Sequence, residues 1–189
     1  MEERETEVNW SSLHVLANAS ELVLDGLISV SPAAQTRPSE LPEIFWNKMQ
    51  EMHGKDVMLV LEKRLSATDV KRHASRLSIP MGQMRASFLT GEEIRALDNK
   101  EEIAVSLIEP CLHVRHGLQL KKWNHKRDNF SYVLTKEWTD VAHPFERNGL
   151  EVSCLVRLWS FRANGDLCFC LVKVEAPPSA AVENMANCE

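Results

Sequence analysis

Apolar residues in the first part of the chain recur at intervals that favour helices. Over residues 9–29 the helical spacing is loose, because the apolar positions fall on several faces. Over residues 42–53 the pattern is clearer, since Pro42 suits a first helical turn and Gly54 stands just beyond the end. Residues 31–42 contain three prolines and predict a linker.

From residue 57 onwards the apolar period changes to two, which is the spacing of side chains along a strand. Alternation is clear over residues 57–62, 103–108 and 152–159. The dipeptide Asn164-Gly165 separates two further apolar runs, and this pair favours the left-handed torsions of a tight hairpin turn. The last two strands are therefore expected to pair across that turn.

Two short helices are expected to interrupt the strands. One follows Pro80 over residues 81–88, and the other covers residues 136–143, with Thr135 as its N-cap and Pro144 as its stop. About seven short strands with two small helices predict a mainly β fold, an open or nearly closed antiparallel barrel.

Charge is distributed unevenly along the chain, whose formal net charge is −5. Residues 1–56 carry 10 acids and 4 bases, residues 57–175 carry 15 acids and 18 bases, and residues 176–189 carry 2 acids and no base. A mildly cationic body between acidic ends suggests a polyanionic partner.

The five cysteines form an odd set, and the chain begins with an acidic stretch rather than the cationic start of a secretory signal. Free thiols in a reducing compartment are therefore expected. The apolar stretch over residues 13–28 is interrupted by polar and charged residues and does not suit a membrane span.

Two basic, acid-free segments stand next to predicted strands. The first is Lys71-Arg72-His73, followed by Arg76 and a short apolar run, and the second is Trp123-Asn124-His125-Lys126-Arg127. A basic loop held on a rigid strand can read a groove of DNA, because arginine can bind guanine through two hydrogen bonds, asparagine can pair with adenine, and lysine attracts phosphate. On charge alone, such a run is more often a solvated hairpin loop.

Five motifs, in this order along the chain, resemble the plant B3 DNA-binding domain. They are residues 60–70 (Val-Leu-Glu-Lys-Arg-Leu-Ser-Ala-Thr-Asp-Val), 76–80 (Arg-Leu-Ser-Ile-Pro), Trp123-Asn124, 131–138 (Ser-Tyr-Val-Leu-Thr-Lys-Glu-Trp) and 158–162 (Leu-Trp-Ser-Phe-Arg). Within this family, the chain resembles small plant proteins with one divergent B3 domain. The resemblance implies a seven-stranded pseudobarrel that grips the DNA major groove with two loops.

The resemblance also indicates which residues would touch DNA. The first loop, called here the first arm, is residues 71–76, and the second arm is residues 123–129. Lys136 is added because backbone amides at the start of the predicted helix could bind a phosphate. The candidate DNA-binding residues are Lys71, Arg72, His73, Ser75, Arg76, Lys121, Trp123, Asn124, His125, Lys126, Arg127, Asn129 and Lys136.

Four segments are therefore expected. Residues 1–41 form an acidic, partly helical or disordered region with a proline-rich linker, and residues 42–56 form a short helix that leads into the barrel. Residues 57–175 form the B3-like DNA-binding domain, and residues 176–189 form a disordered tail.

Other chemistry has little support in the sequence. Cys111, His113 and His116 lie close together, but no Cys-x-x-Cys pair exists, and neither a metal nor another cofactor is expected. No nuclease, phosphate-loop or nucleophile signature points to an enzyme, and neither a membrane nor a small-molecule substrate is expected.

Two functions remain open. One is a nuclear, sequence-specific double-stranded DNA-binding protein that regulates transcription. The other is a protein-interaction module that keeps the barrel, has lost DNA reading, and contacts a protein partner through residues 10–28.

Overall fold

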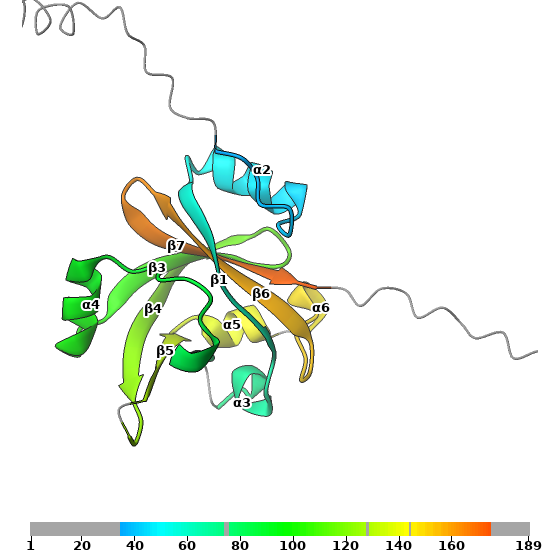
Figure 1. The fold of residues 1–189 in the computed structure, drawn as a ribbon. Helices are drawn as coiled ribbons and strands as arrows, with labels where there is room; N and C mark the ends of the chain where they lie inside the picture. The colour runs from blue at the N-terminus through cyan, green and yellow to red at the C-terminus, as the bar shows by residue number, and fades with distance from the viewer. Residues whose placement is uncertain (1–34, 74–75, 128, 144, 175–189) are drawn as a thin grey trace, which may run out of the picture. The chain divides into compact units, whose positions relative to one another are not determined.

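The computed structural model describes residues 35–73, 76–127, 129–143 and 145–174 (Figure 1). In these residues seven strands form one sheet in the order β1-β6-β7-β3-β4-β5-β2. Neighbouring strands are antiparallel except for the parallel pair β3 and β7. The sheet curls into a nearly closed barrel, so the predicted mainly β, seven-stranded fold is confirmed. The strands are β1 Lys55–Arg64, β2 Leu77–Pro80, β3 Ile103–Ile108, β4 Val114–Asn124, β5 Phe130–Thr135, β6 Leu155–Ala163 and β7 Asp166–Lys173.

The β6–β7 hairpin turns at the dipeptide that the sequence analysis identifies. Ala163 pairs with Asp166, and between them Asn164 and Gly165 have φ angles of 53° and 91°. Positive φ at both central residues suits the tight turn whose twist matches that of the flanking strands. The predicted pairing of the last two strands is confirmed.

Short helices connect and cover the strands. They are α2 Glu43–Glu51, α3 Ala67–Val70, α4 Gly91–Asp98, α5 Trp138–Ala142 and α6 Phe145–Asn148, with one 3-10 turn, η1, at Met81–Gln83. None of the helices in the described part of the chain is long and apolar enough to cross a membrane.

Both helices predicted within the barrel need correction. The helix predicted over residues 81–88 is wrong beyond its first turn, because only η1 is helical there. The helix predicted from residue 136 begins instead at Trp138, since Lys136 and Glu137 have positive φ angles of 40° and 32°. Thr135 therefore lies too early to cap it.

Helix α4 was not predicted, although its start signal is present in the sequence. The backbone N–H of Glu93 donates to the Thr90 hydroxyl at 3.2 Å, and the Glu93 carboxylate accepts from the Thr90 N–H at 2.8 Å. This reciprocal pair is a capping box. Arg162 of β6 donates to both carboxylate oxygens of Glu93 at 2.6 and 2.7 Å, which fixes the helix to the barrel and holds the pKa of Glu93 below its usual value.

Side chains from the strands and from α5 fill the barrel interior. Leu107, Leu134, Trp138 and Phe169 are among the fully buried residues of this core. Complete burial of a large apolar side chain stabilises the fold by about 1.5–3 kcal/mol. The interior is therefore a packed core rather than a channel.

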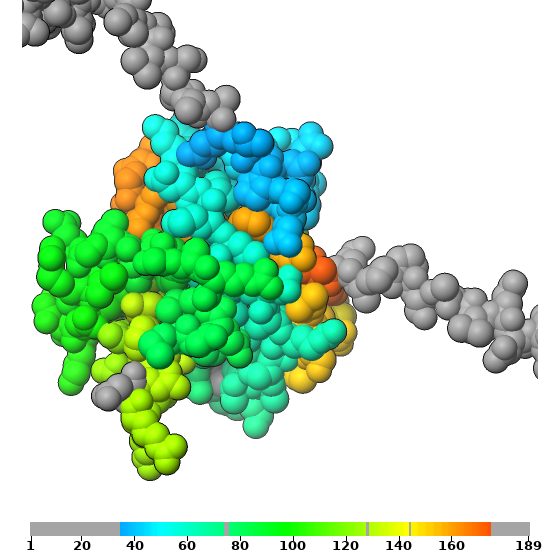
Figure 2. All heavy atoms as spheres, viewed as in Figure 1, coloured from blue at the N-terminus to red at the C-terminus, as the bar shows by residue number. Residues whose placement is uncertain are grey.

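Helix α2 covers the outer face of the sheet and builds a second core. Leu41, Phe45 and Met49 pack with Trp159 and Phe161 of β6. Figure 2 shows α2, in blue, at the end of the barrel where the cyan strand β1 begins. Strands β6 and β7 are consequently buried on both faces, which explains why apolar and polar residues hardly alternate along β7.

The connection from α2 to β1 requires glycine at position 54. The Gly54 N–H donates to the Met49 carbonyl oxygen at 2.8 Å. A Cβ atom at this position would lie 2.8 Å from that oxygen and 2.8 Å from the ring of Phe161. Any larger residue would therefore push α2 away from the sheet.

Packing extends into the segment that the sequence analysis assigns to the N-terminal region. Leu41 is completely buried, and its carbonyl oxygen accepts a hydrogen bond from Arg37 Nη1 at 2.5 Å. Arg157 of β6 donates to the Glu40 carbonyl at 3.2 Å. The compact unit that contains the barrel begins at Arg37.

The sheet ends at β1 and β2, and one side-chain and one backbone hydrogen bond join β1 to β2 and to the segment after β2. Lys63 Nζ of β1 donates to the Ser78 carbonyl oxygen of β2 at 3.0 Å. The Arg85 N–H donates to the Val60 carbonyl at 2.8 Å. Strand β2 has four residues and ends in Pro80.

Candidate nucleic-acid interface

The two basic arms flank three adjacent strands. Strand β5 pairs with β4 on one side and with β2 on the other. The first arm runs from α3 into β2, and the second arm contains the turn between β4 and β5. In Figure 1, α3 and the tip of the β4–β5 hairpin both project at the lower edge of the barrel.

Arg76 of the first arm lies over Trp123 of the second arm. The guanidinium carbon is 4.5 Å from the centre of the indole ring, which is cation–π distance. In the strand register Trp123 faces Ser131, and Arg76 directly precedes the Leu77–Leu134 pair. Both side chains therefore lie on the outer face of β2, β5 and β4. Trp123 is 38% exposed, which is unusual for so large an apolar ring.

The second arm is a hydrogen-bonded turn. The His125 N–H donates to the Asn129 carbonyl oxygen at 2.7 Å, and His125 Nε2 lies 3.0 Å from the Ser131 hydroxyl. Arg127 has a φ of 61°, which reverses the chain. The side chains of Asn124, Lys126 and Arg127 are exposed on this turn. The described residues of this turn thus present these side chains to solvent.

A buried carboxylate holds the start of the first arm. Asp69 is 1% exposed and accepts hydrogen bonds from the Ser66 hydroxyl at 2.6 Å, the Ser78 N–H at 3.0 Å and Lys63 Nζ at 3.0 Å. Burial by itself raises the pKa of Asp69, but the hydrogen bonds from Ser66, Lys63 and Ser78 outweigh it and hold the pKa below its usual value. Asp69 therefore joins α3, β1 and β2 at the base of the arm.

Helix α5 and the residue after it fix the backbone at the same point. Trp138 Nε1 donates to the Asp69 carbonyl oxygen at 2.7 Å, and His143 Nε2 lies 2.7 Å from the Val70 carbonyl oxygen. These supporting residues were not predicted from the sequence. The spacing of Ser66 and Asp69 was an available signal, because it is that of a capping box, which the structure contains.

The remaining candidates of the first arm are exposed where the structure describes them. Lys71, Arg72 and His73 are exposed just beyond the Asp69 anchor. Ser75 lies outside the described residues. Within the described part of the chain, no carboxylate forms an ion pair with Lys71. Its charge is therefore not neutralised by a described neighbour.

The lysines beside the second arm have acidic neighbours. Lys121 forms an ion pair with Glu102 at 2.5 Å, and this hydrogen bond lowers the pKa of Glu102. Lys122 forms an ion pair with Asp98 at 2.5 Å, and its Nζ lies 4.3 Å from the centre of the Phe130 ring. To bind a DNA phosphate, Lys121 would therefore have to break its ion pair with Glu102 or bind both groups at once.

Lys136 lies at the end of β5 opposite the turn of the second arm, and the expected helix start is absent there. Helix α5 begins two residues later and has five residues. Glu137 turns its carboxylate toward Arg115, whose Nη1 is 3.4 Å away. The helix start on which the phosphate site was predicted is therefore shifted from Lys136 to Glu137 as N-cap. The Lys136 side chain is exposed, and its contact with a phosphate stays a prediction.

The described histidines and cysteines do not gather into a metal-binding cluster. No group of three or more histidine, cysteine, aspartate or glutamate side chains is placed there to hold a metal ion. Cys168 and Cys170 are buried in the outer core, and burial raises the pKa of both thiols. These two cysteines act as small core residues.

Comparison with known proteins places the chain in one family. The sequence model of the family described as "B3 domain-containing protein At2g31720-like" matches residues 37–175. The chain is 37% identical over 155 residues to the B3 domain-containing protein At3g25182 of Arabidopsis thaliana, an alignment that covers 75% of this chain and 43% of that protein. It is 30% identical over 146 residues to At2g32645 of the same plant, covering 73% and 76%, and 31% identical over 187 residues to At1g05920, covering 87% and 57%. The chain therefore spans less than half the length of one relative and about three quarters of another.

The family match covers most of the chain, and the seven-stranded barrel agrees with it. The chain therefore belongs to the At2g31720-like family of B3 domain-containing proteins.

Proposed function

We propose that this protein reads a short sequence in the major groove of double-stranded DNA with its two arms, and that it regulates transcription in the nucleus. B3 domains generally bind DNA, and B3 domain proteins are not enzymes.

The contact between Arg76 and Trp123 carries the proposal. It joins two basic segments that lie 47 positions apart in the sequence, on the outer face of three adjacent strands. A guanidinium held on an exposed ring keeps hydrogen-bond donors directed to solvent at a fixed place, which suits bidentate contact with guanine. Asn124 is exposed beside it and is the second candidate for a base contact.

The exposed lysines supply the sequence-independent part of binding. Lys71 and Lys126 extend from the two arms, so they can contact phosphates on either side of the base-reading residues. Arg72, His73, His125, Arg127, Asn129 and Lys136 are exposed and are proposed as further contacts. Lys121 is a weaker candidate because Glu102 neutralises it.

Selection of bound sequences from random duplexes tests the proposal. We expect one short motif to be enriched by the wild-type chain and by Lys55→Ala, a control at an exposed position at the start of β1. We expect Arg76→Ala combined with Asn124→Ala to lose the enrichment. An unenriched pool from wild-type protein at low salt would contradict DNA reading.

The alternative function involves residues 10–28, which lie outside the described residues. If the selection shows no enrichment, this segment becomes the next candidate contact surface, and the barrel becomes a scaffold for protein interaction.

A further inference from the structure

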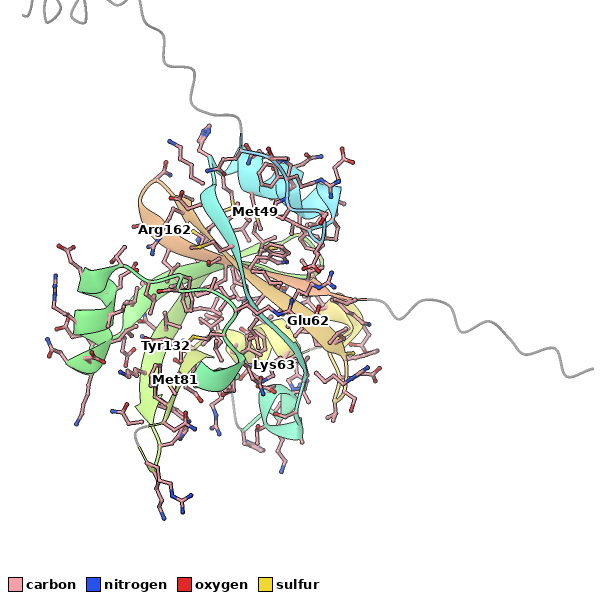
Figure 3. All side chains as sticks on the ribbon, in the orientation of Figure 1. Met49, Glu62, Lys63, Met81, Tyr132 and Arg162 are labelled. Carbon is pink, nitrogen blue, oxygen red and sulfur yellow. The ribbon has the colours of Figure 1, made fainter. Side chains whose placement is uncertain are left out.

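A pocket opens at one mouth of the barrel, beneath the segment that links η1 to α4. Its volume is about 290 Å³, near the lower limit for small-molecule sites, which often lie in the mouths of barrels. Figure 3 shows Met81 and Tyr132, two of its lining residues, close together on this side of the barrel. The apolar lining residues are Met81, Met84, Ala86, Phe88, Leu89 and Ile94.

Tyr132 brings a hydroxyl group to this apolar pocket. The residue is 5% exposed, and its ring packs edge-on against Phe88 and Phe130, with centroids 5.8 and 5.2 Å away. No described residue forms a hydrogen bond with its hydroxyl. The hydroxyl is also not one of the described buried polar atoms that lack a partner, so it reaches solvent and can donate to a ligand in place of water.

Arg85 brings a positive charge to the same pocket. Its backbone is fixed by the bond to Val60, while its side chain is 49% exposed and lies 3.1 Å from Glu62. Glu62 has a closer partner in Arg157 at 2.5 Å, and the Arg157 hydrogen bond is the main cause of the lowered pKa of Glu62. Arg85 can therefore turn to another anion without leaving Glu62 unpaired.

We propose that this pocket binds a small apolar molecule that carries a carboxylate. The apolar body lies among the methionine, leucine, isoleucine and phenylalanine side chains. The carboxylate accepts hydrogen bonds from the Tyr132 hydroxyl and the Arg85 guanidinium. This site is separate from the arms, so the proposal does not depend on DNA binding.

The experiment uses Tyr132 as its own reporter, because the chain contains one tyrosine. Protein with isotope-labelled tyrosine rings gives a single ring environment by NMR. The probe is 2-naphthoate, and 2-naphthamide is its uncharged match. We expect 2-naphthoate to shift the Tyr132 signals saturably and the amide to bind about tenfold more weakly, since hydrogen bonds to charged groups are the stronger class.

Three variants and one control variant locate the site. Arg85→Gln is expected to weaken 2-naphthoate binding about tenfold, whereas Arg95→Gln, at an exposed position of α4 outside the lining, leaves it unchanged. Tyr132→Phe keeps the ring packing and is expected to weaken binding about fivefold by calorimetry. Ser87→Trp fills the pocket from its exposed rim and is expected to abolish binding without touching the buried residues.

Each contrary outcome overturns a stated part of the proposal. The absence of a saturable shift with folded wild-type protein removes the site. Equal affinity for the amide, or equal loss in Arg85→Gln and Arg95→Gln, removes the carboxylate assignment. Full binding by Ser87→Trp places the probe elsewhere on the protein.

Discussion

Trp138 donates a 2.7 Å hydrogen bond from its indole N–H to the carbonyl oxygen of Asp69, across 69 positions of sequence. The side chain of Asp69 meanwhile accepts from Ser66, Ser78 and Lys63. Both the backbone and the side chain of one residue are thus fixed where the first arm begins. The direction in which the arm leaves the barrel depends on this residue and on α5.

Replacing Trp138 by Phe removes the indole donor and leaves most of the ring packing. We expect a loss of about 1–2 kcal/mol in the free energy of unfolding, because a buried carbonyl loses its partner. We also expect weaker binding to the selected duplex through the displaced arm. Urea denaturation and duplex titration measure the two effects, with Trp46→Phe on α2 as control. Unchanged DNA affinity would show that Trp138 supports the core alone.

Asp69→Asn tests the buried network directly. Lys63, whose side chain is 10% exposed, would lose its charged partner, so we expect a destabilisation of about 3 kcal/mol by denaturant titration. Asp98→Asn is the matched control, because the Asp98 side chain is 49% exposed and its ion pair with Lys122 is worth less than about 1 kcal/mol. An equal loss of unfolding free energy in both variants would mean that burial does not strengthen the ion pair of Asp69.

Stability should fall on the acid side. The folded-state pKa values of Asp69, Glu62 and Glu93 are all lowered. A lowered folded pKa gives stability that is fully present above the unfolded value of about 4 and is lost as the pH falls through the folded value. Unfolding free energies measured between neutral pH and about pH 3 should therefore decrease, and less steeply for Asp69→Asn. A flat profile for wild-type protein would contradict these three pKa directions.

The arms should separate into two contact classes. Arg76→Ala and Asn124→Ala are expected to cost about 1–3 kcal/mol on the selected duplex and little on random DNA, because base-edge bonds depend on sequence. Lys71→Ala and Lys126→Ala should weaken binding to both duplexes alike and reduce the salt slope by about one. Titrations at several salt concentrations distinguish the classes. If none of these four changes alters affinity, the arms do not contact DNA.

The segment before α2 should matter for folding from Leu41 onwards. Leu41 is completely buried in the outer core, so Leu41→Ala is expected to destabilise the protein by about 3 kcal/mol. Ile44→Ala, at a position 56% exposed on α2, serves as the control and should cost less than about 0.5 kcal/mol. Deletion of residues 1–36 should leave the thermal midpoint nearly unchanged. A large fall after that deletion would move the domain boundary earlier.

The sequence predicted those features that depend only on residues close to one another along the chain. The turn at Asn164-Gly165, the start of α2 after Pro42 and the strand alternation needed only neighbouring residues. Helix α4 could also have been predicted from Thr90 and Glu93. The late start of α5 could not, because the positive φ of Lys136 and Glu137 has no local cause such as glycine.

Long-range relationships were beyond the sequence. Nothing in the helical pattern of residues 42–53 says that α2 covers the outer face of β6 rather than the barrel mouth. The contact of Arg76 with Trp123 depends on the register of three strands. The pairing of Lys121 with Glu102 likewise depends on how the residues before β3 pass β4. Candidate site residues could be named from the sequence, but their partners could not.

The bridged seam between β1 and β2 also affects how copies of this protein behave in concentrated solution. An exposed sheet edge offers unpaired backbone groups on which another chain can add a strand, the first step of many aggregation processes. Here the edge strand β2 is short, ends in a proline that lacks an N–H, and already gives its Ser78 carbonyl to Lys63. Because such features discourage the addition of a foreign strand, we expect the open side of this barrel to resist self-assembly.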